Sequence, residues 1–472
     1  MPARLRPSQT LLLASLVFGL FFGAGNLIFP AGLGRDAGSS VTAATLGFLV
    51  TAVGLPVLGI VASALTGSRS VRDMTAPISG RFAVVFTCLL YLTIGPLFAI
   101  PRTAMVSYEI GVTPFTGDST VGRVLFSLLF FALAAVAAFR PGRLMDWIGR
   151  YLTPVFLVLL GTLAVAAAVS PMTADPLPAP APAYAEAPLV QGFLDGYNTM
   201  DALASLAFAV VIVDAARRLG VESPRRMAVE LGKAGAVGGL GMAAVYAALA
   251  YLGATSVGAV AQAENGGDVL AGASQHYFGR AGLYLIAAIV FVACLKTCIG
   301  LIVACAQMFS DLFPGVYRVW AGAFLLVSFA VANLGLDAIV AWSVPVLMLL
   351  YPIAVVVILL GLAWSRVRHH LVVARCVVAF TAAAALFDLL GALPKPLAAT
   401  PAVTALTGLA ARVLPGYEVG FGWVVPALVG LAVGVGLAVS RRRTSSREAE
   451  GMGRGERLCH HDLDHAQTQG ES

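Results

Sequence analysis

A glycine-rich stretch interrupts the first long apolar segment of the chain, residues 10–32. Gly23, Ala24, Gly25 and Asn26 lie near its middle. Glycine forms helices poorly and asparagine is costly in lipid, so the stretch predicts a break in a membrane helix. The N–H groups of an unwound stretch can hold a carboxylate, its carbonyl groups can hold a cation, and Asn26 adds a side-chain oxygen. Close helix packing through small residues is the structural alternative.

A second apolar segment, residues 191–214, is unusually polar for a membrane helix. Asp195 fits a helix end at the membrane interface, whereas Asp201 lies deeper. A carboxylate at that depth usually faces a wet cavity or a partner, which favours a second break. We therefore predict a substrate site that both breaks share, formed by Ala24, Gly25, Asn26, Thr199, Asp201 and Ser205.

A lysine stands in the middle of another apolar segment, residues 281–306. Lys296 could replace a bound Na⁺, carry a proton, pair with Asp201 or Glu109, or extend to the interface along a lipid-facing surface. Its neighbour Thr297 can offer a hydroxyl oxygen to a cation. The sulfur of Cys298 is a soft ligand that suits Na⁺ poorly.

The segment at 82–107 contains two prolines, which weaken its helix, and Arg102 near its outer end. Glu109 follows about two helical turns later. An arginine inside the membrane is a functional candidate, and an arginine that reaches the interface is the alternative. We consider Lys296, Glu109 and Arg102 as candidate coupling residues.

The composition requires a bilayer around these segments. Hydrophobic residues make up 59% of the 472 residues and charged residues only 11%, and the mean hydropathy is +0.89. Soluble domains carry about 25% charged residues. The sequence predicts an all-α polytopic membrane protein with about twelve transmembrane helices, within the apolar segments 10–32, 41–66, 82–107, 122–139, 151–170, 191–214, 230–254, 281–306, 319–336, 338–363, 372–393 and 421–440.

Arginines mark one side of the membrane. Alternate loops hold Arg69, Arg72 and Arg81; Arg140, Arg143 and Arg150; Arg217, Arg218, Arg225 and Arg226; Arg318; and Arg366, Arg368 and Arg375. Arg4 and Arg6 precede the first segment, and Arg441, Arg442 and Arg443 follow the last. By the positive-inside rule, we predict a cell-membrane protein with both termini in the cytoplasm. The arginines lie in short loops rather than on one basic face, which argues against nucleic-acid binding.

Residues 1–440 are predicted to form one transmembrane domain. The two predicted breaks lie five segments apart, which indicates an inverted repeat with a binding site at the membrane midplane. Spans 1–5 (10–170) form the first repeat, spans 6–10 (191–363) the second, and 372–440 adds two helices. The polar tail 441–472 is predicted to be disordered, so its Cys459, His460, His461 and His465 lack the fixed frame of a metal site.

Several stretches resemble the bacterial family of Na⁺-coupled branched-chain amino acid transporters. They are FGAGNLIFP at 22–30, TAVGLP at 51–56, GPLFAIPRTA at 95–104 followed by Glu109, GYNTMD at 196–201, NLGL at 333–336 and SVP at 343–345. The resemblance, which runs over residues 10–390, implies a fold of the leucine-transporter type. It also implies uptake of Leu, Ile and Val with Na⁺ as the coupling ion and no cofactor.

By analogy with that fold, the amides near Ala24 and Gly25 would meet the substrate carboxylate. The carbonyl groups of Gly19 and Phe22, with the helix face of Thr297 and Cys298, would form the cation site. A carrier that is coupled to protons or uncoupled is the first alternative. A polytopic membrane enzyme is a remote one, because no predicted span contains a histidine and no catalytic cluster appears near an interface.

Overall fold

The computed structural model describes residues 5–23, 25–139, 153–173, 176–260 and 262–440, and the secondary structure in these ranges is helical. The helices of the N-terminal half are α1 (Pro7–Phe21), α2 (Gly25–Ala37), α3 (Val41–Leu49), α4 (Leu55–Thr66), α5 (Val71–Thr75), α6 (Gly80–Leu92), α7 (Ala99–Gly111), α8 (Thr113–Thr116), α9 (Thr120–Ala138) and α11 (Thr153–Val169). Short π-helical stretches, η2 (Val50–Gly54) and η3 (Thr93–Leu97), join α3 to α4 and α6 to α7.

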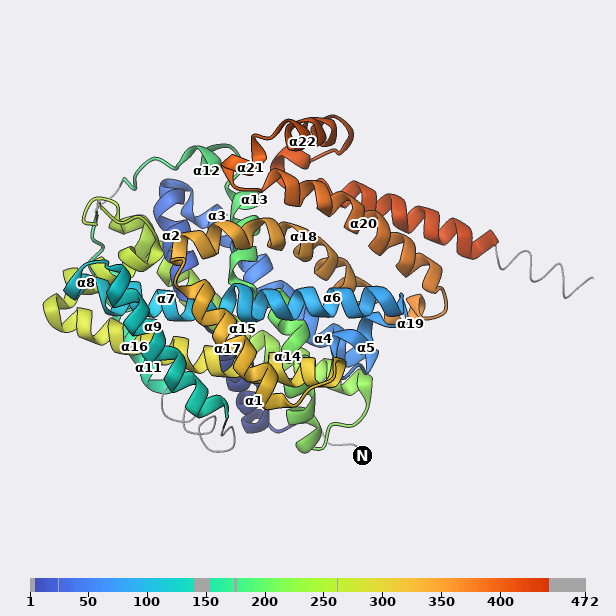
Figure 1. Ribbon diagram of the computed structural model, residues 1–472, viewed down its shortest axis with the longest axis horizontal. Helices are drawn as coiled ribbons and strands as arrows, with labels where there is room; N and C mark the ends of the chain where they lie inside the picture. Colours follow the sequence, from blue (N-terminus) through green and yellow to red (C-terminus); the bar gives the residue numbers. More distant parts are fainter. Residues whose placement is uncertain (1–4, 24, 140–152, 174–175, 261, 441–472) are drawn as a thin grey trace, which may run out of the picture.

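The C-terminal half continues with α12 (Pro182–Glu186), α13 (Pro188–Asp195), α14 (Asp201–Arg218), α15 (Pro224–Ser256), α16 (Gly266–Leu312), α17 (Tyr317–Ala332), α18 (Leu336–Leu362), α19 (Trp364–Val367), α20 (Leu371–Gly391), α21 (Lys395–Ala398) and α22 (Pro401–Val413). A last apolar helix covers Val424–Ser440. In Figure 1 α1 lies at the bottom of the molecule, and α12 and α22 lie at the top.

The all-α membrane fold predicted from the sequence is confirmed. Within the described ranges, seven helical stretches are long and apolar enough to cross a membrane, and the bent pair α13 and α14 makes an eighth. The other predicted apolar segments contain shorter apolar helices, at 7–21, 160–169, 317–332 and 424–440. Each of the twelve predicted apolar segments therefore contains a helix.

Both predicted helix breaks are present. α1 ends at Phe21, Phe22 is extended (φ −72°, ψ 103°), and α2 begins at Gly25. Ala24, which we assigned to substrate binding, lies outside the described residues. α13 continues through a 3₁₀ turn, η5 (Gly196–Thr199), to Met200. The axis of α14, which follows, is bent by 44° from that of the preceding helical segment.

The two broken helices pack in equivalent ways. α1 and α2 both lie along α15, while α13 and α14 lie along α3 and α4. A Cβ on Gly34 of α2 would stand 1.8 Å from the carbonyl oxygen of Ala250 in α15. A Cβ on Gly192 of α13 would stand 1.9 Å from the carbonyl oxygen of Ala44 in α3. Small residues let these backbones touch, and the matching pairs are what an inverted repeat requires.

The predicted repeat boundaries at 10–170, 191–363 and 372–440 stay predictions. The tail 441–472, with its cysteine and histidines, lies outside the described residues, as do the arginines at 4, 140, 143, 150 and 441–443.

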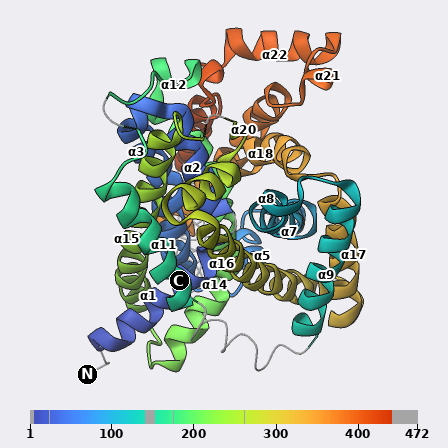
Figure 2. The same cartoon turned by 90° about the vertical axis from the view of Figure 1, so that its left-hand side faces the viewer.

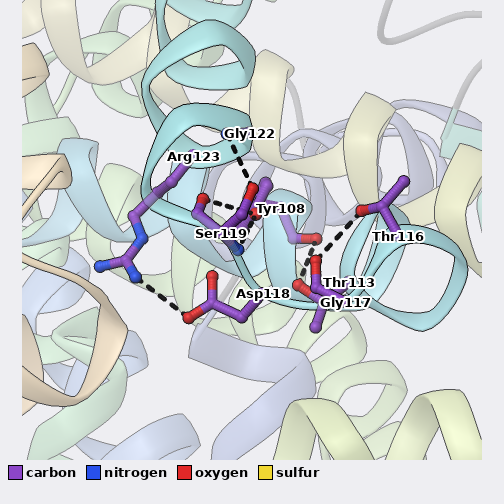
Figure 3. A network of polar contacts seen from close by, with 8 residues as sticks. All are labelled: Tyr108, Thr113, Thr116, Gly117, Asp118, Ser119, Gly122 and Arg123. Atoms are coloured by element: carbon purple, nitrogen blue, oxygen red, sulfur yellow. Dashed lines mark hydrogen bonds and ion pairs between the residues drawn. The ribbon is translucent and has the colours of Figure 1, made fainter.

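A polar network fixes the end of α7 against the start of α9. The hydroxyl of Tyr108 accepts a hydrogen bond from the Ser119 N–H (3.2 Å) and donates one to the Ser119 carbonyl oxygen (3.1 Å). The side chain of Ser119 in turn caps α9 by accepting from the N–H of Gly122 (Figure 3). Figure 2 shows α7 in the interior of the molecule, with α9 and α17 side by side beyond it. α7 is thus held firmly where it presents Arg102.

The second break depends on a strained residue. Met200 has φ 62°, a left-handed conformation that non-glycine residues rarely adopt, and its side chain is buried. Replacing Met200 by leucine keeps the side-chain volume, whereas isoleucine is branched at Cβ and tolerates this conformation poorly. We expect the isoleucine variant to unfold more easily than the leucine variant by about 2 kcal/mol. Equal thermal stability of the two purified variants in detergent would contradict this.

Candidate substrate and ion site

A cavity of about 40 Å³ lies where the two helix breaks meet. Its polar lining comes from four parts of the chain that are distant in sequence: the first break, α7, the second break and α16. The lining includes Gly25, Asn26, Arg102, Thr199, Asp201 and Thr297. Leu20, Phe21, Ile94, Met200, Phe208 and Leu301 supply its apolar lining. The cavity therefore combines polar groups that can orient a ligand with apolar groups that can hold a side chain.

Asn26 connects the two breaks. Its Oδ1 accepts a hydrogen bond from the N–H of Gly23 at 2.8 Å, so it caps the unwound stretch of its own helix. Its Nδ2 donates to the Oδ2 of Asp201 at 2.6 Å, across to the start of α14. A buried amide that satisfies both partners fixes their relative positions.

Tyr246 of α15 completes this group, and the sequence offered no signal for it. Its hydroxyl donates to the Oδ2 of Asp201 at 3.1 Å and accepts a hydrogen bond from Asn26. The ring of Tyr246 also stacks against Phe22. A tyrosine within a long apolar segment has no spacing relation to the polar residues of other segments. Only the packing of α15 against α1 and α2 brings it to the site.

Arg102 enters the cavity from α7 and is almost completely buried. Its Nη1 donates to the carbonyl oxygen of Asn198 at 2.6 Å, and its Nη2 donates to the Oγ of Ser343 at 3.2 Å. Its guanidinium lies over the ring of Phe29, 4.9 Å from the centroid. Its Nε has no hydrogen-bond partner. The guanidinium is therefore held by contacts with both broken helices and with α18. Its hydrogen-bond donors are not all used, because Nε has no acceptor.

The structure brings some of the residues of the predicted cation site close together. The N–H of Gly23 bonds to Asn26, so the carbonyl group of Gly19 does not receive the amide that would continue the helix. A Cβ on Gly23 would lie 3.0–3.5 Å from the side chain of Thr297, which places α16 against this break. The hydroxyl of Thr297 donates to the Ala293 carbonyl oxygen and keeps its lone pairs for another partner.

Three other predicted residues do not line this cavity. Ser205 is buried, donates to the Ala202 carbonyl oxygen at 2.7 Å and packs against Gly59 of α4. Cys298 is buried on the side of α16 that faces Thr103 of α7. Phe22 is buried and is itself the extended residue of the first break. Their assigned roles in substrate and ion binding stay predictions.

The remaining candidate coupling residues lie outside the cavity as well. Lys296 has no ion pair within the described ranges, so the suggested pairing with Asp201 or Glu109 is not formed here. Glu109 lies near the C-terminal end of α7, where its carboxylate accepts a hydrogen bond from Asn265 at 3.2 Å.

A larger cavity of about 330 Å³ lies beside the first, lined by residues that include Phe29, Asp36, Asp195, Asn198 and Asp337. Arg102 touches both Phe29 and Asn198, so these three residues form the layer between the two cavities. At the rim, Tyr184 of α12 donates to Asp195 at 2.6 Å. Burial and then the charge of Asp195 raise the pKa of Tyr184, so its hydroxyl remains a donor.

The sequence profile of the family described as branched-chain amino acid transport protein matches residues 6–441. The chain belongs to this family.

Relatives in the branched-chain amino acid transport protein family resemble the chain over most of its length. The branched-chain amino acid permease BrnQ of Lactobacillus delbrueckii subsp. lactis is 44% identical over 92% of this chain and 97% of its own. BrnQ of Bacillus subtilis is 38% identical over 94% of this chain and 100% of its own. The branched-chain amino acid transport system 2 carrier protein of Pseudomonas aeruginosa is 45% identical over 76% and 81%. These names describe permeases and carriers, and the prediction that the chain is not an enzyme is confirmed.

Solved structures confirm the fold of this family member. The chain is similar to Mhp1, a nucleobase-cation-symport-1 family transporter, in a closed conformation with bromovinylhydantoin bound, with a TM-score of 0.59 and 13% identity over 93% of this chain and 96% of the other. The inward-facing conformation of Mhp1 matches equally well, with a TM-score of 0.59 and 14% identity over 93% and 95%. At this identity the likeness is one of fold.

Proposed function

We propose that the chain takes up the branched-chain amino acids Leu, Ile and Val across the cell membrane by Na⁺ symport with alternating access, and that both termini are cytoplasmic. Membership of the family supports the substrate class. The observation that carries the mechanism is the buried cavity at the meeting point of two helix breaks, where Asn26 joins the first break to Asp201 of the second. Unwound backbone at this depth is tolerated where it lines a cavity.

The chemical character of the cavity lining, rather than its volume, suits an amino acid with an aliphatic side chain. Its polar groups are concentrated at Asn26, Arg102 and Asp201, and apolar residues such as Ile94 and Phe208 cover the rest. Polar groups fix the orientation of a ligand, and apolar groups contribute free energy of binding through burial. A side chain with a charge of its own would be left without a partner among these apolar residues.

Sodium coupling is supported by the contact between the first break and α16. The Gly19 carbonyl group and the Thr297 hydroxyl are hard oxygen ligands of the kind that Na⁺ prefers, and Gly23 lies directly against Thr297. One positive charge that crosses about 100 mV releases about 2.3 kcal/mol, enough for roughly fifty-fold accumulation of a neutral solute.

A proton-coupled or uncoupled carrier is the second candidate. Lys296 is adjacent to Thr297 and has no ion pair within the part of the chain that the structure describes. A fixed ammonium group at this place could replace a bound Na⁺, and one that loses its proton could carry it. Leucine flux into proteoliposomes, with Na⁺ and pH varied separately, distinguishes these mechanisms from sodium symport. Undiminished flux with choline in place of Na⁺ would overturn sodium coupling.

Thr297 offers a test of the ion site itself. Replacing Thr297 by alanine removes the hydroxyl oxygen, and we expect the Na⁺ concentration for half-maximal leucine uptake to rise about tenfold. Replacing Thr297 by serine keeps the oxygen and should leave that concentration within about twofold of the original. If alanine and serine variants show the same Na⁺ dependence, Thr297 is not a cation ligand.

A further inference from the structure

Two opposite charges lie buried at the central cavity without touching each other. Arg102 and Asp201 are each only 2% exposed, and both line the same cavity. Within the described ranges, the ion pairs involve other residues, such as Arg123 with Asp118 and Lys233 with Glu230. Neither Arg102 nor Asp201 therefore has an opposite charge in contact.

Neutral groups alone surround each of these charges. Arg102 donates to a carbonyl oxygen and a hydroxyl, and its Nε is left without a partner. The carboxylate of Asp201 accepts from an amide and from the phenol of Tyr246. A buried charge that lacks a counter-charge destabilises a protein unless binding or function requires it.

The two charges contact consecutive residues of the first break. A Cβ on Gly25 would lie 3.5 Å from the Nη1 of Arg102, so the absence of a side chain leaves the guanidinium open toward the cavity. The next residue, Asn26, holds the carboxylate of Asp201 at 2.6 Å. Both residues line the cavity beside this break.

We propose that Arg102 and Asp201 together bind the zwitterionic head of the amino acid, with the guanidinium on the substrate carboxylate and the Asp201 carboxylate on the substrate ammonium group. An α-amino acid carries one group of each sign on a single carbon atom, so one ligand supplies both missing counter-charges. This assignment rests on the proposed function and deepens it. It gives Arg102 a direct role in substrate recognition rather than in coupling, and it makes the zwitterion, more than the aliphatic side chain, the feature that the site requires.

The proposal predicts how the site treats two analogues of leucine. 3-Methylbutylamine is leucine without its carboxylate, and 4-methylpentanoate is leucine without its ammonium group. Each analogue leaves one buried charge unpaired, so we expect each to bind at least about a hundredfold more weakly than leucine to the unmodified transporter. Binding is measured by displacement of radiolabelled leucine from purified protein in detergent, under the Na⁺ and pH conditions that give maximal leucine binding.

Variants then assign each charge to its ligand group. In Arg102→Gln, leucine should lose about a hundredfold in affinity while 3-methylbutylamine does not, so discrimination between the two collapses. In Asp201→Asn, the discrimination between leucine and 4-methylpentanoate should collapse instead. Arg123→Gln, which removes an arginine in the first turn of α9 that pairs with Asp118, is the matched control and should leave both ratios unchanged.

The outcomes separate this proposal from the function on which it rests. A transporter that binds no leucine under any Na⁺ or pH condition contradicts the proposed function. If Arg102→Gln binds leucine and the ratio of its affinities for leucine and 3-methylbutylamine is unchanged, the proposed role of Arg102 is wrong. Loss of a merely structural arginine would weaken the binding of both ligands equally. If Arg102→Gln fails to fold, Arg102→Lys keeps a positive charge and should retain the discrimination with weaker leucine binding. Loss of the discrimination in the lysine variant would overturn the proposal.

Discussion

Replacing Asn26 by leucine should lower leucine uptake by at least about a hundredfold, although the two side chains have similar volume. Asn26 accepts from the Gly23 N–H and donates to Asp201 and Tyr246, so a leucine leaves a buried carboxylate and a buried amide with one partner fewer each. Loss of hydrogen bonds at buried charged groups costs about 1.5–3 kcal/mol each. The variant also removes the connection between the two broken helices.

Initial rates of uptake in proteoliposomes measure this effect. Asn333→Leu is a matched control, because Asn333 also makes hydrogen bonds to Phe329 and Ser127 but lies outside the cavity. We expect the control to retain uptake within about threefold once protein amounts are equalised. Wild-type rates in the Asn26 variant would show that the site does not depend on the connection between the breaks.

Replacing Gly34 by valine should destabilise the protein by more than about 3 kcal/mol. The new Cβ would stand 1.8 Å from the carbonyl oxygen of Ala250, an atom of the helix backbone that no rotamer change can move. The helices α2 and α15 would have to separate, and their shared contacts would be lost. Gly192→Val should behave in the same way, because its Cβ would meet the Ala44 carbonyl oxygen at 1.9 Å.

Gly322→Val serves as the control, because a Cβ on Gly322 of α17 has no neighbouring atom within 4 Å. Thermal unfolding of the purified variants in detergent, followed by tryptophan fluorescence, compares their stabilities. We expect the Gly34 and Gly192 variants to unfold at much lower temperatures than the control. A Gly34 variant that unfolds at the same temperature as the control would mean that α2 and α15 are not in backbone contact.

The two breaks could be predicted from the sequence because their signals are local. Gly23, Gly25 and Asn26 are unfavourable in a membrane helix wherever it packs, and the same holds for Asp201. The face that each helix turns to the cavity could not be predicted. In a membrane helix that is apolar all round, hydrophobic periodicity does not separate the lipid-facing side from the buried side.

This limit explains why some site residues were missed and others lie elsewhere. Ser205 was expected to bind substrate, but the rotation of α14 points it toward Gly59 of α4. Thr297 lines the cavity, whereas its neighbour Cys298 does not. The partners of Arg102, Asn198 and Ser343, depend on contacts between α7, the second break and α18, which no short-range spacing encodes.

The glycine contacts between α2 and α15, and between α13 and α3, constrain how this molecule can move. Helices that meet through side chains can slide past one another, because rotamers adjust. Here a shift along the axis would push a neighbouring side chain into a carbonyl oxygen, so each pair has to turn as one rigid body. α1 is tied to the same partner, because a Cβ on Gly238 of α15 would stand 2.8 Å from the Ala14 carbonyl oxygen, so both halves of the first broken helix stay with α15. We therefore expect any rearrangement of this molecule to move α2 together with α15, and α13 together with α3, rather than one helix of either pair along its own axis.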